Sequence, residues 1–183
     1  MYNSYKLQFE SEMIYLKLIR LRDEDIKEFK QLMINAFQYG YEYFCGKDKE
    51  QVLPEKDIDD DLKKENTFAY EMIDNNEIIG GVIVSINEKT NHNYLDFLFV
   101  KVGVQNKGIG KKIWNEIEKL YPNTKVWATC TPYFDKRNIH FYVNKLKFKI
   151  VEYSNKPEDK EEQDEMFLDD GGMFEFEKEM KKY

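Results

Sequence analysis

Residues 105–110 have the types and spacing of a phosphate-binding turn. They read Gln-Asn-Lys-Gly-Ile-Gly and stand between an apolar segment, 94–102, and a segment with the spacing of an amphipathic helix. Gly108 and Gly110 permit a tight turn in which several backbone N–H groups point to one place, and the helix N-terminus adds about half a positive charge. Three lysines surround the same turn: Lys107, Lys111 and Lys112. Because they lie within a Debye length of about 8 Å, the turn is predicted to bind an anion such as a pyrophosphate.

Two other phosphate-binding motifs do not fit this turn. A P-loop needs Gly-Lys-Ser/Thr after four intervening residues, and although Gly103 and Gly108 have that spacing, Ile109 and Gly110 follow. A dinucleotide-binding fingerprint needs a third glycine where Ile113 stands, and the helix needs Ile113 for its apolar stripe. A plain tight turn between a strand and a helix remains the alternative.

Asp96 and Tyr142 are the candidates for proton transfer. Asp96 interrupts the apolar segment 94–102, where a carboxylate without a partner is costly, so it indicates a catalytic base or a group paired with a lysine or a backbone N–H. Tyr142 and Asn138 share a helical stripe, which predicts a tyrosine hydroxyl at the rim of a cleft; an ordinary packing tyrosine is the alternative. Glu71, on another predicted strand, is the reserve base.

The remaining reactive side chains carry weaker signals. Cys45 and Cys130 form no CxxC pair, so no disulfide scaffold is expected, and an acyl-carrier role for Cys130 is the minor alternative to a structural thiol. His92 and His140 share no metal-ligand spacing with cysteines or carboxylates, so no metal is expected, and His140 is predicted to be solvated. The acidic run 57–61 is more typical of a solvated helix face than of an acceptor-binding patch.

Hydrophobic periodicity predicts one domain over 1–183, an α/β (α+β) fold with one mixed sheet and helices on both faces, in the order β-α-α-β-β-β-α-β-α-β-β. Strands are predicted at 13–20, 67–73, 77–86, 94–102, 125–130, 148–153 and 173–180. Helices are predicted at 23–40, 54–65, 109–120 and 135–147. Asp23 is predicted to cap the first helix and Gly40 to end it, and Leu120 to complete the apolar stripe of the third. An acidic loop is expected at 155–170.

The composition excludes several function classes. Hydrophobic residues make up 42% of 183, which predicts a packed core. The 28 basic and 35 acidic residues give a net charge of −7, which argues against a nucleic-acid partner and suits either a cationic acceptor or simple solubility. No apolar run is long enough for a signal peptide or a membrane span, so a cytoplasmic protein without a membrane partner is expected.

Two segments resemble motifs of the GNAT N-acetyltransferases. Residues 100–110 resemble the family's acetyl-coenzyme A signature, Gln/Arg-x-x-Gly-x-Gly/Ala after a strand ending in valine. Gln105, Gly108 and Gly110 occupy the signature positions, although Gly103 stands about where the family often has a proline. Residues 138–148 resemble the later segment Asn…Tyr-x-Lys-x-Gly-Phe, with Lys147 in place of the glycine. The order of elements also resembles that fold over roughly 13–180.

The resemblance implies a mostly antiparallel sheet that splays between the strands at 94–102 and 126–130 to admit acetyl-coenzyme A. Backbone N–H groups near Leu98 to Val100 would then hold the thioester oxygen as an oxyanion hole does. The residues implied to bind the cofactor are Leu98, Phe99, Val100, Gln105, Asn106, Lys107, Gly108, Ile109, Gly110, Lys111 and Asn138.

The resemblance also assigns chemistry to the two candidate side chains. It implies that Tyr142 protonates the coenzyme A thiolate, and some members, notably polyamine acetyltransferases, carry an acidic residue where Asp96 stands, four positions before the same valine. The predicted function is direct transfer of acetyl from acetyl-coenzyme A to a primary amine of a small molecule or peptide, with a homodimer as one assembly that the family allows. A non-catalytic acyl-coenzyme A sensor is the alternative, and a hydrolase lacks a Ser–His–Asp pattern or a metal cluster.

Overall fold

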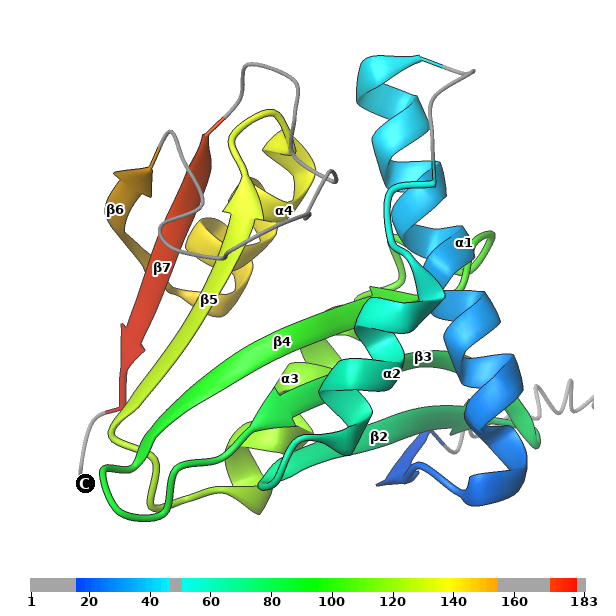
Figure 1. Ribbon diagram of the computed structural model, residues 1–183, viewed down its shortest axis with the longest axis horizontal. Helices are drawn as coiled ribbons and strands as arrows, with labels where there is room; N and C mark the ends of the chain where they lie inside the picture. Colours follow the sequence, from blue (N-terminus) through cyan, green and yellow to red (C-terminus); the bar gives the residue numbers. More distant parts are fainter. Residues whose placement is uncertain (1–15, 47–50, 155–171, 181–183) are drawn as a thin grey trace, which may run out of the picture.

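A seven-stranded sheet in the order β1-β2-β3-β4-β5-β7-β6 positions the residues considered above (Figure 1). The computed structural model describes residues 16–46, 51–154 and 172–180. The strands within these ranges are β1 Lys17–Arg20, β2 Thr67–Asp74, β3 Glu77–Ser85, β4 His92–Val100, β5 Val126–Pro132, β6 Lys149–Ser154 and β7 Met173–Glu179. The helices are α1 Ile26–Cys45, α2 Glu55–Lys63, α3 Ile109–Leu120 and α4 Lys136–His140, with a 3₁₀ turn η1 Asp23–Asp25 before α1 and a π-helix η2 Phe141–Leu146 after α4.

The predicted fold class and order of elements are confirmed. Residues 13–15 of the predicted first strand and the predicted loop at 155–170 lie outside the described residues. Helices α1 and α2 cover one face of the sheet and α3 lies behind it, as Figure 1 shows. In the described ranges, no helix has the length and apolar character needed to cross a bilayer.

The sheet opens between its two central strands. Neighbouring strands pair antiparallel except β4 and β5, which are parallel. The β4–β5 ladder runs only from His92 opposite Val126 to Tyr94 opposite Ala128, and the strands then diverge (Figure 1). Thr129 Oγ1 donates a hydrogen bond of 2.9 Å to the backbone oxygen of Leu95 where the ladder ends. The predicted splay is therefore present.

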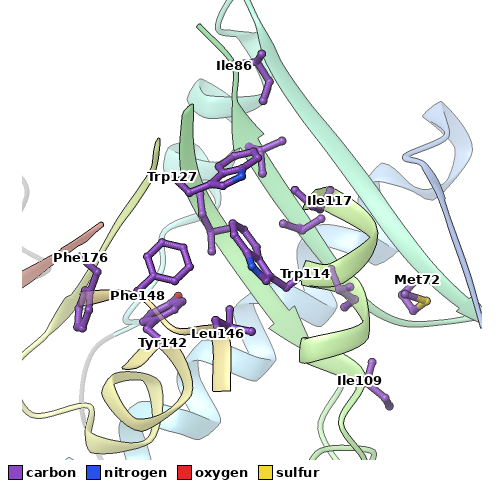
Figure 2. Close-up of a cluster of buried hydrophobic side chains, with 14 of the residues drawn as sticks. Met72, Ile86, Ile109, Trp114, Ile117, Trp127, Tyr142, Leu146, Phe148 and Phe176 are labelled. Carbon is purple, nitrogen blue, oxygen red and sulfur yellow. The ribbon is translucent and has the colours of Figure 1, made fainter. Parts of the chain in front are cut away.

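Two apolar clusters anchor the helices to the two faces of the sheet. Behind the sheet, Trp114 of α3 packs edge-on against Trp127 of β5, with ring centroids 5.1 Å apart (Figure 2). On the other face, Phe29 of α1 packs edge-on against Phe99 of β4. A Cβ atom at Gly81 of β3 would lie 2.2 Å from the Phe29 ring, so only glycine allows this approach of α1.

The first helix departs from the prediction at both ends. Asp23 lies inside the 3₁₀ turn η1 and makes no cap, and α1 continues through Gly40 to Cys45. Glycine costs only about 1 kcal/mol in a helix interior, and Tyr41 gains an edge-on contact with Phe134 at 5.7 Å, which favours continuing the helix. Gly46, with a φ of 87°, ends the helix instead.

Leu120 was predicted to complete the apolar stripe of α3, but it is 52% exposed. The stripe that starts at Ile113 and Ile117 continues at i+4 to Tyr121, which packs against Trp127 with ring centroids 6.0 Å apart. Ile109 and Trp114 are also buried on this helix.

The predicted helix at 135–147 begins as expected, because the Asp135 side chain accepts a hydrogen bond of 2.8 Å from the Asn138 backbone N–H. It is α-helical only as far as His140 and continues as the π-helix η2. A π turn holds more residues than an α turn, so it rotates the side chains that follow. Lys147 takes a φ of 69°, the left-handed conformation that glycine usually supplies at a helix end.

Candidate active site

A cavity of about 640 Å³ lies among the end of β4, the start of α3, the middle of α1 and the helical segment α4–η2. Every residue predicted to hold the cofactor lines this cavity except Lys107, which is exposed beside it. The lining residues in that set are Leu98, Phe99, Val100, Gln105, Asn106, Gly108, Ile109, Gly110, Lys111 and Asn138. Two segments about thirty residues apart (Gly108 to Asn138), the turn before α3 and the start of α4, are thus brought to one place.

The turn before α3 has the backbone conformation that its glycines predict. Gly103, Asn106 and Gly108 all have positive φ, of 92°, 66° and 76°. Gln105 turns back, so that its Oε1 accepts a hydrogen bond of 3.0 Å from the Gly103 N–H. Gly108 is the N-cap of α3, and the N–H groups of the first helical turn have no acceptor within the helix. Their residues, from Ile109 to Lys111, line the cavity, so the positive end of the helix is available there.

Gly110 is closely packed in this first turn. A Cβ atom there would lie 3.1 Å from Cζ of Phe141 and 3.5 Å from Cδ2 of Leu98, both of which line the cavity. The missing side chain therefore lets the helix N-terminus sit close to β4 and η2 and keeps space open in front of its amides.

The cavity also carries positive charge that the sequence reasoning missed. Arg137 and Lys145 line it together with Lys111 and His140. The signal was present, because Arg137, Phe141 and Lys145 are spaced i, i+4, i+8 and so share one helical stripe. His140 is exposed as predicted, and its Nδ1 lies 2.9 Å from Asn144 Nδ2.

Where β4 and β5 diverge, the edge of β4 that faces β5 has backbone groups without a strand partner among the described residues. Lys101 donates its N–H to the oxygen of Ile79 in β3 at 2.9 Å. Because successive residues of a strand direct their N–H groups to opposite neighbours, the N–H groups of Val100 and Leu98 point away from β3, toward the side where β5 has diverged. This edge can accept an extended chain as an added strand.

Tyr142 lies deeper than predicted. Its side chain is only 7% exposed and packs between Phe148 and Phe176 rather than at the rim of the cavity (Figure 2). The π-helix turns Tyr142 and Leu146 toward the core and leaves Val143 half-buried. Burial raises the pKa of the Tyr142 hydroxyl, and a hydrogen-bonding contact with Thr129 opposes that shift. The hydroxyl therefore stands beside the residue that bridges β4 and β5 where they part.

Asp96 is the extra residue of a β-bulge in β4. Its neighbours Phe97 and Leu95 pair with the successive residues Ile83 and Val84 of β3, so Asp96 has no partner in the ladder. Its Oδ2 accepts a hydrogen bond of 2.8 Å from Ser85 Oγ. Burial raises the pKa of Asp96 to about 6, and the hydrogen bond from Ser85 opposes the rise. The side chain is not part of the cavity wall.

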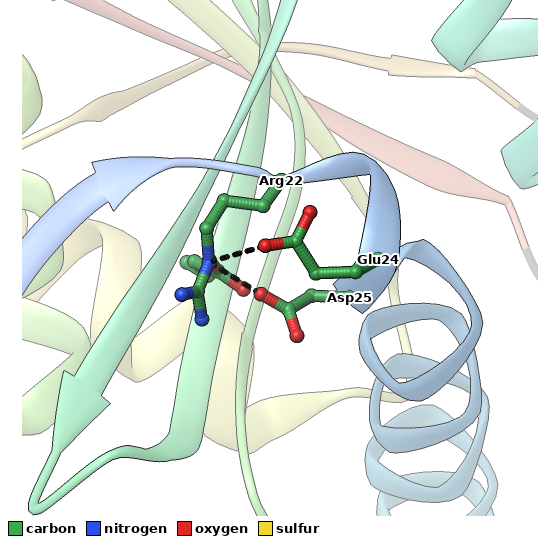
Figure 3. Close-up of polar contacts among 4 residues, drawn as sticks. Arg22, Glu24 and Asp25 are labelled. Carbon is green, nitrogen blue, oxygen red and sulfur yellow. Dashed lines mark hydrogen bonds and ion pairs between the residues drawn. The ribbon is translucent and has the colours of Figure 1, made fainter.

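Glu71, the reserve base, belongs to a separate cluster at the start of α1. Its side chain is fully buried, and Arg22 Nε donates to its Oε1 at 3.0 Å. The same Nε lies 2.6 Å from Asp25 and 3.9 Å from Glu24 (Figure 3). Burial raises the pKa of Glu71, and the Arg22 hydrogen bond opposes it. This arrangement ties β2 to the beginning of α1 and does not line the cavity.

Among the residues that the structure describes, the other reactive side chains do not form a second centre. In the part of the chain that the structure describes, no group of three or more histidines, cysteines or carboxylates is placed to hold a metal ion. Cys130 is half-buried on β5, where it interacts with the Tyr94 hydroxyl.

Comparisons with known proteins identify the family and the fold. The model of the Acetyltransferase (GNAT) family matches residues 27–148. The uncharacterized protein YrkN of Bacillus subtilis (strain 168) is 36% identical over 169 residues, which are 88% of this chain and 91% of that protein.

Solved structures share the fold at low identity. The PaiA N-acetyltransferase of Thermoplasma acidophilum, in complex with coenzyme A, superposes with a TM-score of 0.68 at 16% identity over 90% of this chain and 99% of that one. The ribosomal-protein-S18-alanine N-acetyltransferase of Escherichia coli gives 0.63 at 11% identity over 88% and 92%. A GNAT acetyltransferase of Elizabethkingia anophelis with acetyl-CoA bound gives 0.62 at 18% identity over 90% and 98%. The family match over most of the chain shows that this protein belongs to the GNAT acetyltransferase family.

Proposed function

We propose that this protein transfers an acetyl group from acetyl-coenzyme A to a primary amine, directly and in a ternary complex. The observation that carries the proposal is the cavity in which the glycine turn, the N-terminus of α3 and the open edge of β4 converge. Family membership supports the reaction class, and solved relatives of the same fold hold coenzyme A or acetyl-CoA.

The residues present fit this cosubstrate. The amides at the start of α3, together with Lys111, Arg137 and Lys145, suit a pyrophosphate and a further phosphate. The backbone edge at Leu98 and Val100 suits the amides of a pantetheine arm, and Asn138 adds a side-chain amide on the opposite wall. When bound, acetyl-coenzyme A supplies an acetyl group activated as a thioester.

Asp96 is the proposed base. An alkylammonium must lose a proton before it attacks, which costs about 4.6 kcal/mol at pH 7 for an amine with a pKa near 10.4. With a pKa of about 6, Asp96 is ionised at neutral pH and can accept that proton. Since its carboxylate lies off the cavity wall, the transfer runs through a water that Asp96 holds.

Tyr142 is the proposed acid. Its raised pKa keeps the hydroxyl protonated at neutral pH, so it is able to donate toward a departing sulfur. Its contact with Thr129 puts the hydroxyl where β4 and β5 part, which is where a chain added along β4 would end. Phe148 and Phe176 hold the ring in place.

The acceptor class is a small-molecule or peptide amine. The net charge of −7 favours a cationic acceptor. Among proteins of the same fold, one is named for acetylation of ribosomal protein S18 alanine and the NatC complex was solved with a Gag peptide, so the fold accommodates peptides. A cytoplasmic location and a homodimer remain predictions.

A thiol-release assay over a panel of alkylamines, amino acids and peptides tests the proposal. We expect coenzyme A release from acetyl-coenzyme A with at least one amine, and a large loss of that release in the Asp96→Asn variant. Absence of calorimetric binding of coenzyme A would overturn the proposal at its foundation.

A non-catalytic acyl-coenzyme A sensor is the second candidate. It is favoured by one observation, that neither Asp96 nor Tyr142 is on the cavity wall. A sensor binds coenzyme A with normal affinity and releases no thiol with any amine in the panel, so the same two measurements separate the candidates.

A further inference from the structure

A row of three side chains crosses the sheet beside the proposed base. Thr67 of β2 lies directly opposite Ser85 of β3, and their hydroxyl oxygens are 3.1 Å apart. Ser85 Oγ in turn donates to Asp96 Oδ2 of β4 at 2.8 Å. The bulge in β4 makes this contact, because Ser85 pairs in the ladder with Tyr94 and reaches Asp96 only diagonally.

The chemistry of the groups fixes the direction of both hydrogen bonds when Asp96 is ionised. A carboxylate only accepts hydrogen bonds, so the single proton of Ser85 must point to Asp96. Ser85 then has only lone pairs left for Thr67, and Thr67 must donate to Ser85. The row is therefore polarised from β2 to β4 and stabilises the charged form of the carboxylate.

The charged groups around Asp96 favour its ionised form less strongly than the hydrogen bond from Ser85 does. Asp61 of α2 disfavours the ionised carboxylate and Lys64, directly after α2, favours it, and these two form an ion pair with each other. On β4 itself, the Tyr94 hydroxyl is close enough to feel the Asp96 charge. Ser85 is the group whose hydrogen bond favours ionised Asp96 most strongly.

We propose that Ser85, supported by Thr67, is a positioning residue that holds Oδ2 of Asp96 and leaves Oδ1 to take the acceptor's proton through the water that Asp96 holds. This inference rests on the proposed function, in which Asp96 is the base. Ser85 touches neither the acceptor nor the reacting atoms, and it acts by fixing the orientation and the charge state of the carboxylate.

The test is the Ser85→Ala variant, with the pH dependence of kcat/KM as the readout. Loss of the hydrogen bond disfavours the carboxylate, so the acidic limb is expected to move to higher pH by about one unit. Activity then falls about tenfold below the limb and is unchanged well above it. Ser85→Thr is expected to restore the limb, and Ser154→Ala, at the end of β6, leaves it in place. A limb that does not move in Ser85→Ala would overturn the inference.

Thr67→Val tests the same row without touching the Ser85–Asp96 contact. It is expected to move the limb in the same direction by a smaller amount, and it carries the test if Ser85→Ala does not fold. An unmoved limb in Thr67→Val would then count against the row.

A second readout separates this inference from the proposed function. Titration of the Asp96 carboxyl carbon by NMR needs no acceptor, and it is expected to show the same upward shift in Ser85→Ala. If no amine is acetylated but the carboxyl shift is present, the proposed function fails and the Ser85–Asp96 coupling stands. If amines are acetylated and neither readout moves, the positioning role fails alone.

Discussion

At neutral pH the Asp96 carboxylate is ionised, although its burial in the fold disfavours the charged form. Burial raises its pKa from 3.8 to about 6, with Ser85 and Lys64 opposing the rise. The folded protein therefore binds this proton more tightly than the unfolded chain, and the contribution of Asp96 to stability declines as pH rises from about 4 to 6. A buried carboxylate with a raised pKa is expected where a reaction needs a base with a pKa near neutrality.

Replacing Asp96 by Asn is predicted to stabilise the protein while removing activity. Above pH 6 the amide avoids the cost of a buried charge, so the free energy of unfolding should rise by about 1–2 kcal/mol at pH 7.5. At pH 4 both side chains are neutral, and the difference should shrink toward zero. Urea denaturation at the two pH values measures this. A variant that is less stable than the parent at pH 7.5 would show that the carboxylate is a structural partner instead.

Tyr142→Phe is predicted to separate binding from chemistry. The ring packs against Phe148 and Phe176, so phenylalanine should keep the fold and the affinity for coenzyme A. Loss of the proton donor should lower turnover by about 10² to 10⁴. Steady-state kinetics with a cognate amine, alongside calorimetry with coenzyme A, gives both numbers. Unchanged turnover would remove Tyr142 from the mechanism.

At the residue scale, the sequence predicted the glycine turn that lines the cavity better than the surroundings of Asp96 and Tyr142. Gly108 and Gly110 are visible in sequence because a backbone turn depends on local residue type. The depth of Tyr142 was not predictable from helical spacing, since the π-helix shifts the side-chain register by tertiary packing. The partner of Asp96 was also hidden, because a bulge brings Ser85 to it from a neighbouring strand.

At the scale of the element, the geometry at the start of α3 depends on the backbone conformation of Gly108. Gly108 caps the helix with a φ of 76°, and a Cβ atom there would meet nothing within 4 Å. A side chain at this position would therefore meet no steric clash. A substitution would disturb the turn only because other residues disfavour the left-handed backbone conformation. In the long α1, by contrast, Gly40 has ordinary helical geometry and does not end the helix. The contact of its neighbour Tyr41 with Phe134 favours the continuation of α1 past Gly40.

Gly108→Val is predicted to weaken coenzyme A binding at least about tenfold. A β-branched residue disfavours the left-handed conformation by roughly 1–2 kcal/mol, which turns the first amides of α3 away from one another. Gly46→Val is the matched control, since Gly46 flanks a helix (as the C-cap of α1) with positive φ and open space around it. Both variants should lose similar stability in urea, and only Gly108→Val should lose affinity in calorimetry. Equal affinities in the two variants would contradict the role of the turn.

At the scale of the whole molecule, the sheet consists of two parts joined by a short central ladder. Strands β1 to β4 form one part and β5, β7 and β6 the other, with pairing between them only from His92 to Tyr94. Tyr41 on α1 and Phe134 after β5 make a further contact between the parts. The fold class followed from the sequence because strand and helix periods are local signals. The length of the central ladder did not, since pairing between distant strands leaves no local pattern.

A chain bound along β4 would supply the pairing that this ladder lacks, and hydrogen exchange can detect it. Coenzyme A at about a hundred times its Kd should stabilise the folded state by about 2.7 kcal/mol, which slows exchange through coupled opening about a hundredfold. We expect this protection at Leu98 and Val100 and also in β5 and β7, because opening either part releases the ligand. We expect little change in the edge strand β1, because an edge strand can open without releasing the ligand. Protection confined to the first turn of α3 would mean that the phosphates bind while the arm stays outside the splay, and the direct-transfer geometry would then fail.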